Sequence, residues 1–206
     1  EQGTCYNFLY YCCNKEKKRD AYPLLEAAIK ELENVPQYQK KQEEYKLTYG
    51  KIISNMGSYY YQKREYEEAL KWHKKALEFR KLSLPDRVMD SYRTIMSDYF
   101  CMKQYEKGYE TYREAIKKTQ PDALFLVRAI GCELCLLKEK KEENLEKQIL
   151  EELPVQIERV VELAMSNRRK NVGVLKDLQK KLEELEAWTE LKELVKEYRA
   201  KIEEYL

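Results

Sequence analysis

The sequence predicts an all-α protein made of antiparallel helical hairpins, and three observations lead to that fold class. Glycine and proline, which most often interrupt helices, account for only 6 and 5 of the 206 residues. Apolar side chains recur three and four positions apart through most of the chain. Two segments, one starting at Gly50 and one at Met89, also match each other position by position. Because helix-breaking residues are few and the apolar residues have helical spacing, we expect long helices joined by short turns.

The first segment, residues 50–81, has the pattern of one helical hairpin. Ile53, Met56 and Tyr60 share a face of its first helix, because residues three and four apart lie on the same side of a helix. Polar residues 62–65 predict the turn. The second helix repeats the spacing at these positions: Ala69, His73 and Ala76.

The second segment, residues 89–120, repeats this pattern 39 positions later. Its turn is predicted at Lys103 and Gln104, and its packed positions are Tyr92, Ile95, Met96, Tyr99, Tyr112 and Ala115. Small residues stand where two helix backbones would approach closely, at Gly57, Ala69, Ala76, Gly108 and Ala115.

These residues resemble the tetratricopeptide repeat, whose 34-residue pattern has W-x2-L-G-x2-Y followed by A-x3-F, A and P. Gly57, Tyr60, Ala69 and Ala76 match the pattern in the first segment, and Tyr92, Ile95, Tyr99, Tyr112, Ala115 and Pro121 match it in the second. The departures are Ile53, His73, Met96 and Gly108, and the repeat is about 5 residues longer than the family pattern. The resemblance implies a right-handed superhelical solenoid of antiparallel hairpins.

Weaker copies flank the two segments, so that repeats are predicted over about 2–36, 37–85, 86–121 and 122–153. Residues 15–20 predict the turn of the first copy, and Gln37 is expected to open an extended first helix of the next. In the last copy the turn is predicted at 138–143, with a partner helix near Leu145–Leu153. Residues 1–153 therefore form the predicted repeat domain.

Residues 154–206 form a second predicted part, in which Pro154 opens a helix that runs to about Asn167. A later apolar series changes phase between Leu185 and Leu191, which predicts a kink or turn near 186–188. Two interpretations stay open: capping helices that cover the last repeat, or a coiled-coil stem that joins two chains.

The resemblance also implies which residues line a binding groove, because first helices form the concave wall in that family. The residues at those positions are Tyr6, Tyr10, Lys51, Ser54, Asn55, Ser58, Tyr61, Gln62, Arg93, Ser97, Arg128 and Cys132. Amide side chains can bond a peptide backbone, and arginine can hold a carboxylate. The groove therefore predicts an extended peptide as ligand.

Two subclasses of the family bear on the ligand. One binds chaperone C-termini through a clamp of Lys, Asn, Asn, Lys and Arg; Asn55 matches one clamp position, but Tyr6, Tyr10, Asp90 and Thr94 depart from it. The other is the sensory region of bacterial quorum-sensing regulators, in which long repeats bind a signalling peptide and control a helix-turn-helix domain. This chain is similar to that region in composition, and no DNA-reading domain is expected within it.

The sequence does not predict an enzyme, a metal site or a cofactor. His73, the single histidine, stands at a packed position of its repeat. Cys132-x-x-Cys135 has a spacing that can bind zinc, but it lies within a predicted helix without a histidine or a second pair nearby. Structural packing is therefore the expected role of both.

Charge and cysteine content limit the kinds of partner and the cellular compartment that the sequence predicts. Lys and Arg number 39 against 37 Asp and Glu, a balance that predicts neither nucleic acid nor a membrane surface as partner. The basic runs at 15–19 and 168–170 are too short for a continuous basic face. The 6 cysteines do not form a disulfide framework, and no apolar stretch reaches the ~20 residues of a membrane span, so a cytoplasmic protein is expected.

The sequence thus predicts a protein- or peptide-binding module, acting as a scaffold or as the sensory region of a regulator. Its alternative is a structural module that forms a homodimer through the C-terminal helices.

Overall fold

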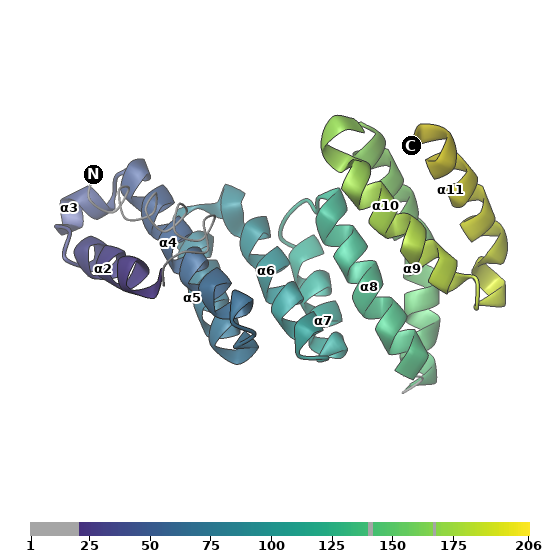
Figure 1. Cartoon of the computed structure of the whole chain (residues 1–206), viewed down its shortest axis with the longest axis horizontal. Coiled ribbons are helices and arrows are strands. Elements are labelled where there is room, and N and C mark those ends of the chain that lie inside the picture. The colour runs from purple at the N-terminus through teal and green to yellow at the C-terminus, as the bar shows by residue number, and fades with distance from the viewer. Residues whose placement is uncertain (1–20, 140–141, 167) are drawn as a thin grey trace. The chain divides into compact units, whose positions relative to one another are not determined.

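The computed structural model describes residues 21–139, 142–166 and 168–206, and every regular element in these ranges is a helix (Figure 1). The predicted all-α class is therefore confirmed. The chain divides into two compact units, Glu1–Met102 and Lys103–Leu206. This division falls inside the predicted repeat domain, at the turn predicted for residues 103 and 104.

Unit 1 contains α2 (Tyr22–Glu33), α3 (Gln37–Lys40), α4 (Glu43–Gln62), α5 (Tyr66–Ser83), the 3-10 turn η1 (Pro85–Arg87) and α6 (Val88–Cys101). Helix α4 packs on α2 and α5, and α5 packs on α6. Leu25 and Ile29 of α2 meet Ile52 and Met56 of α4 in the core, where Ala76 of α5 leaves room for close packing. Of the face predicted for the first repeat segment, Ile53 and Met56 are buried, and Tyr60 packs partly buried against the same core.

Unit 2 contains α7 (Tyr105–Ile116), α8 (Ala123–Glu139), α9 (Glu143–Met165), α10 (Arg168–Leu185), η2 (Thr189–Leu191) and α11 (Lys192–Tyr205). Helix α8 is the central element, since it packs on α7, α9 and α10, and α11 then covers α9 and α10. The α8 sequence ALFLVRAIGCELCLL is apolar on nearly all sides, as a helix with neighbours on several faces requires.

The tight turns before α5 and before α7 share one backbone geometry. Arg64 and Lys103, which stand 39 positions apart, have positive φ values of 64° and 57°. The hydrogen bonds around them repeat with the same offset: Lys63 N donates to Tyr59 O as Met102 N donates to Asp98 O. The internal repeat seen in the sequence is therefore also present in the backbone of its turns.

Two predicted helix boundaries were wrong. Pro154 does not open a helix, because α9 runs continuously from Glu143 to Met165 with the proline inside it. Ile149 and Leu153 before the proline and Ile157 and Val160 after it are all buried, so packing of one continuous face outweighs the lost hydrogen bond. The extended helix expected from Gln37 is also interrupted, since α3 ends at Lys40 and α4 begins at Glu43.

The phase change in the C-terminal part corresponds to a real turn, since α10 ends at Leu185 and η2 begins at Thr189. The apolar series on both sides of this turn is buried inside unit 2: Leu175, Leu178, Leu182, Leu185, Leu191, Val195, Tyr198 and Ile202. The first predicted hairpin, with its turn at 15–20, lies outside the described residues.

Candidate functional site

Half-buried polar side chains stand at equivalent positions of α4 and α6 in unit 1. On α4 they are Ser54, Asn55 and Ser58. The buried neighbours Ile52, Ile53 and Met56 turn toward the core, and helical geometry places the polar residues between that core and solvent. The equivalent residues of α6 are Arg93, Thr94 and Ser97, again half-buried. We call these six residues the polar strip.

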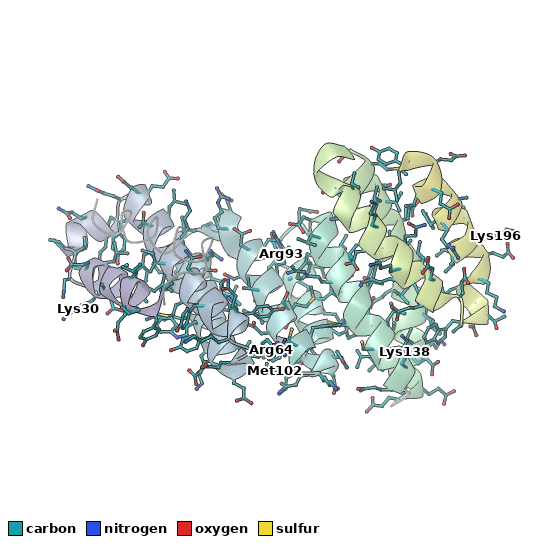
Figure 2. The ribbon with its side chains drawn as sticks, viewed as in Figure 1. Lys30, Arg64, Arg93, Met102, Lys138 and Lys196 are labelled. Atoms are coloured by element: carbon teal, nitrogen blue, oxygen red, sulfur yellow. The ribbon has the colours of Figure 1, made fainter. Side chains whose placement is uncertain are left out.

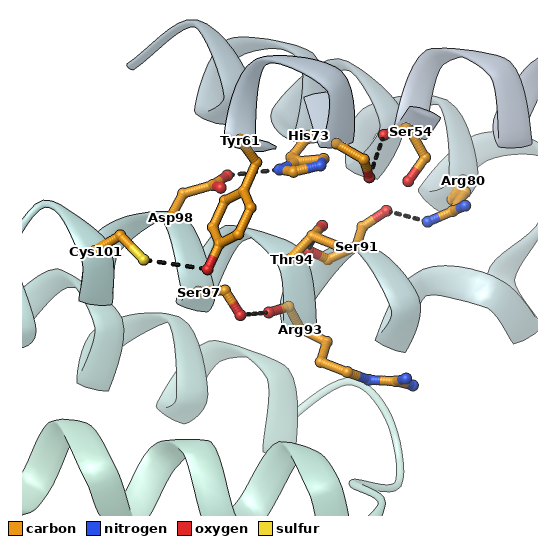
Figure 3. Close-up of polar contacts among 11 residues, drawn as sticks. Ser54, Tyr61, His73, Arg80, Ser91, Arg93, Thr94, Ser97, Asp98 and Cys101 are labelled. Atoms are coloured by element: carbon orange, nitrogen blue, oxygen red, sulfur yellow. Dashed lines mark hydrogen bonds and ion pairs between the residues drawn. The ribbon is translucent and has the colours of Figure 1, made fainter. Parts of the chain in front are cut away.

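Three hydroxyl groups of the strip donate their protons to their own helices. Ser58 Oγ donates to the carbonyl of Ser54 at 3.2 Å, and Ser97 Oγ donates to the carbonyl of Arg93 at 3.0 Å (Figure 3). Thr94 Oγ1 donates in the same way to the carbonyl of Ser91 at 2.9 Å. A hydroxyl that donates inward keeps its oxygen lone pairs as acceptors. These side chains are therefore suited to accept N–H groups from a bound polypeptide.

Tyr61 closes one end of the strip and connects α4 to α6. Its hydroxyl lies 3.1 Å from Sγ of Cys101, and its ring stands edge-on to Tyr66 with centroids 5.4 Å apart. Figure 3 shows the side chain reaching toward Ser97 and Cys101. Contacts with both α5 and α6 hold the ring in place, so it offers a preformed aromatic surface.

Arg93 supplies the positive charge of the strip. Its Nη2 donates to Oδ1 of Asp90 at 3.2 Å, one helical turn earlier on α6. The side chain points away from the buried His73 and Asp98 (Figure 3). A pair this exposed adds little stability, with 26% and 45% of the side chains accessible, and its main effect is to orient the guanidinium.

Buried polar contacts connect α5 to α4 and α6, the two helices that carry the strip. Nδ1 of His73 on α5 lies 2.6 Å from Oδ2 of Asp98 on α6. Burial raises the pKa of Asp98, and His73 partly opposes that effect. Arg80 of α5 donates to Ser91 Oγ of α6 at 2.8 Å and to the Gly50 carbonyl of α4 at 3.4 Å. The strip is therefore preorganised by contacts that do not themselves face solvent.

A hollow of about 380 Å³ adjoins the Tyr61 end of the strip. It is lined by Arg64, Glu65, Tyr66, Glu67, Glu68 and Met102. Arg64 and Met102 are labelled in Figure 2. Tyr66 of this lining contacts the ring of Tyr61, which places the hollow next to the aromatic end of the strip.

The residues predicted to line the groove differ in their exposure and in the unit to which they belong. Ser54, Asn55, Ser58, Tyr61, Arg93 and Ser97 are half-buried in unit 1, while Lys51 and Gln62 are exposed at the edges of α4. Arg128 is half-buried on α8 and belongs to unit 2. Cys132 was wrongly placed on the wall, because it is fully buried within unit 2. Tyr6 and Tyr10 lie outside the described residues.

The buried polar residues Arg80, Ser91 and Asp98 were missed as part of this region. Ser91 and Asp98 stand four before and three after Ile95, on the buried face of α6. The sequence signal for these buried residues was a polar side chain at helical spacing from a core residue. His73 was expected to pack in the core and does so, at 2% exposure.

Within residues 21–139, 142–166 and 168–206, no group of three or more His, Cys, Asp and Glu side chains is arranged to hold a metal ion. None of the helices in these same ranges has the length and apolar character needed to cross a membrane. No protein-family model matches the chain, and a search of curated proteins returns no match.

Proposed function

We propose that unit 1 is a protein- or peptide-binding module that holds an extended polypeptide along the polar strip. The observation that carries this proposal is the arrangement of the strip itself: inward-donating hydroxyls and an oriented arginine, supported from below by buried polar contacts. Such a surface matches a backbone, whose N–H groups seek acceptors and whose carbonyls seek donors.

The chemistry of the strip defines the kind of ligand. Ser54, Ser58 and Ser97 are small, so a bound backbone can lie close to the helices. Arg93 suits a carboxylate, because the guanidinium offers several N–H groups in a plane. Tyr61 supplies an apolar surface at the other end. An extended peptide with an acidic group near Arg93 and an apolar side chain near Tyr61 fits best.

The resemblance to tetratricopeptide repeats supports this proposal, as does the 39-residue recurrence of the turn geometry. In this proposal the hairpins belong to a right-handed superhelix that acts as a scaffold or as the peptide-sensing region of a regulator. Burial of the apolar residues of α10 and α11 within unit 2 supports a capping role for these helices over a dimer stem.

Selection of random peptides on the 206-residue chain tests the proposal. The selected peptides are then titrated by fluorescence anisotropy. Asn55→Ala combined with Arg93→Ala should weaken binding at least tenfold, because Arg93 holds the carboxylate and Asn55 the backbone. The matched control is Asn144→Ala with Arg159→Ala, an exposed Asn and Arg on α9. Equal affinity of the Asn55/Arg93 variant and the wild type would remove the proposal, provided that their circular dichroism melts coincide.

A further inference from the structure

The α8–α9 interface of unit 2 contains a carboxyl group without solvent contact. Glu133 of α8 is 0% exposed and Gln156 of α9 is 4% exposed. Gln156 Nε2 donates to Glu133 Oε1 at 2.6 Å. Glu133 Oε2 and Gln156 Oε1 have no hydrogen-bond partner among the residues that the structure describes. One side-chain donor is far too little to stabilise a carboxylate removed from water.

The surroundings of Glu133 disfavour a negative charge further. Glu152 lies one turn before Gln156 on α9 and accepts hydrogen bonds from Tyr109 Oη at 2.9 Å and from Gln148 Nε2 at 2.9 Å. The carboxylate of Glu152 is therefore a negative neighbour of Glu133. Burial raises the pKa of Glu133 to about 8, the bond from Gln156 opposes the rise, and Glu152 adds to it.

Among the residues that the structure describes, no cation is paired with this carboxyl. Helix α7 contributes Tyr109 and Tyr112, whose pKa values are themselves raised by burial first and by nearby carboxylates second, with Arg113 as a weak opposing charge. On α8 the neighbour is the buried thiol Cys132, and the charge of Lys181 on α10 lowers the pKa of that thiol against the larger effect of burial.

We propose that Glu133 is a proton-binding site that couples the docking of α9 on α8 to pH. With the proton bound, the neutral carboxyl packs in the interface. Without it, the interface holds an uncompensated charge beside Glu152, and α9 separates more readily from α8.

The direction of the effect follows from linkage. A glutamate in an unfolded chain loses its proton near pH 4.3, whereas the buried group keeps it to a higher pH. The stability contributed by the bound proton is therefore complete below pH ~4.3 and is lost progressively until the folded pKa is passed. The interface loosens across the neutral range as pH rises and tightens on acidification.

Hydrogen exchange of the full chain, measured by mass spectrometry between pH 5 and 8, tests this proposal. After correction for intrinsic exchange, the opening constant of α8 and α9 amides should rise up to about tenfold per pH unit in the wild type. Glu133→Gln keeps the shape and stays neutral, so its opening constant should rise much less steeply. Glu151→Gln, at an exposed position of α9, is the matched control and should follow the wild type.

Parallel pH profiles for the wild type and Glu133→Gln would overturn the proposal. If Glu133→Gln does not fold, a ¹³C NMR titration of the Glu133 carboxyl in the wild-type chain decides instead. A midpoint well above that of the exposed glutamates supports the proton site, and a midpoint among them rules it out.

Discussion

His73 and Asp98 form a buried pair across α5 and α6, with Nδ1 and Oδ2 2.6 Å apart and side-chain exposures of 2% and 0%. Removing the carboxylate in Asp98→Ala leaves Nδ1 of His73 buried without its partner. We expect a loss of about 3 kcal/mol in the free energy of unfolding, measured by urea denaturation. Asp90→Ala, which breaks the exposed pair with Arg93, should lose less than ~1 kcal/mol. Similar losses for the two variants would contradict a special role of the buried pair.

Gly57 of α4 lies directly against the imidazole of His73. A Cβ added at Gly57 would stand 2.5 Å from Nε2 of His73, so the ring or a helix would have to move. Gly57→Ala should therefore lower the free energy of unfolding by about 2 kcal/mol, as overpacking of a core does.

The control for this prediction is Gly173 of α10, where an added Cβ meets nothing within 4 Å. Gly173→Ala should raise stability by ~0.5–1 kcal/mol, because alanine restricts the unfolded chain. Thermal melts of the two variants should shift in opposite directions. An unchanged or raised melting temperature of Gly57→Ala would show that the His73 contact does not limit position 57.

Arg64 and Lys103 adopt a left-handed backbone conformation that is unfavourable for residues with a Cβ. Arg64→Gly and Lys103→Gly should each raise the free energy of unfolding by ~0.5–1 kcal/mol, the strain relieved being partly offset by a more flexible unfolded chain. Lys63→Gly is the control, because Lys63 has a right-handed φ of −78° and should lose stability. Chemical denaturation compares the three glycine variants. If all three are less stable than the wild type, the backbone at Arg64 and Lys103 is not strained.

Pro154 interrupts the hydrogen-bond ladder of α9 without ending the helix. Pro154→Ala restores an N–H group to the ladder and removes the clash of the ring with the preceding turn. We expect a gain of ~1–2 kcal/mol, reduced from the full effect of a helical proline because proline also stiffens the unfolded chain. Val155→Ala, at a neighbouring exposed position, should change stability by less than ~0.5 kcal/mol. Equal melting temperatures of Pro154→Ala and the wild type would mean that the packing of α9 depends on the ring.

The sequence predicted what depends on periodicity and local turns. The buried positions Ile53 and Met56 and the break before Thr189 follow from the spacing of apolar residues, and the turn at 62–65 follows from its polar residues. The prediction for Pro154 was wrong because proline usually marks the start of a helix. In α9, buried residues on both sides of the proline keep the helix continuous. Tertiary packing can outweigh one missing hydrogen bond, and a single sequence does not display that packing.

Polar residues inside the core were harder to predict. Asp98 and Glu133 stand among apolar residues, and each position marks an exception to the pattern around it. The identity of their partners, His73 and Gln156, depends on how helices 23 or more positions apart come together. The strip on α4 was predicted from family resemblance, but its hydroxyl directions and the support from Arg80 required coordinates.

The shared geometry of Arg64 and Lys103 has a consequence for how such a chain can lengthen. One of these turns lies within a compact unit and the other marks the division between two, yet the backbone builds both in the same way. A separate linker is therefore not needed to begin a new unit. A duplicated hairpin that carries its own turn could be inserted at either place, so that gene duplication alone would extend the protein without new loop designs.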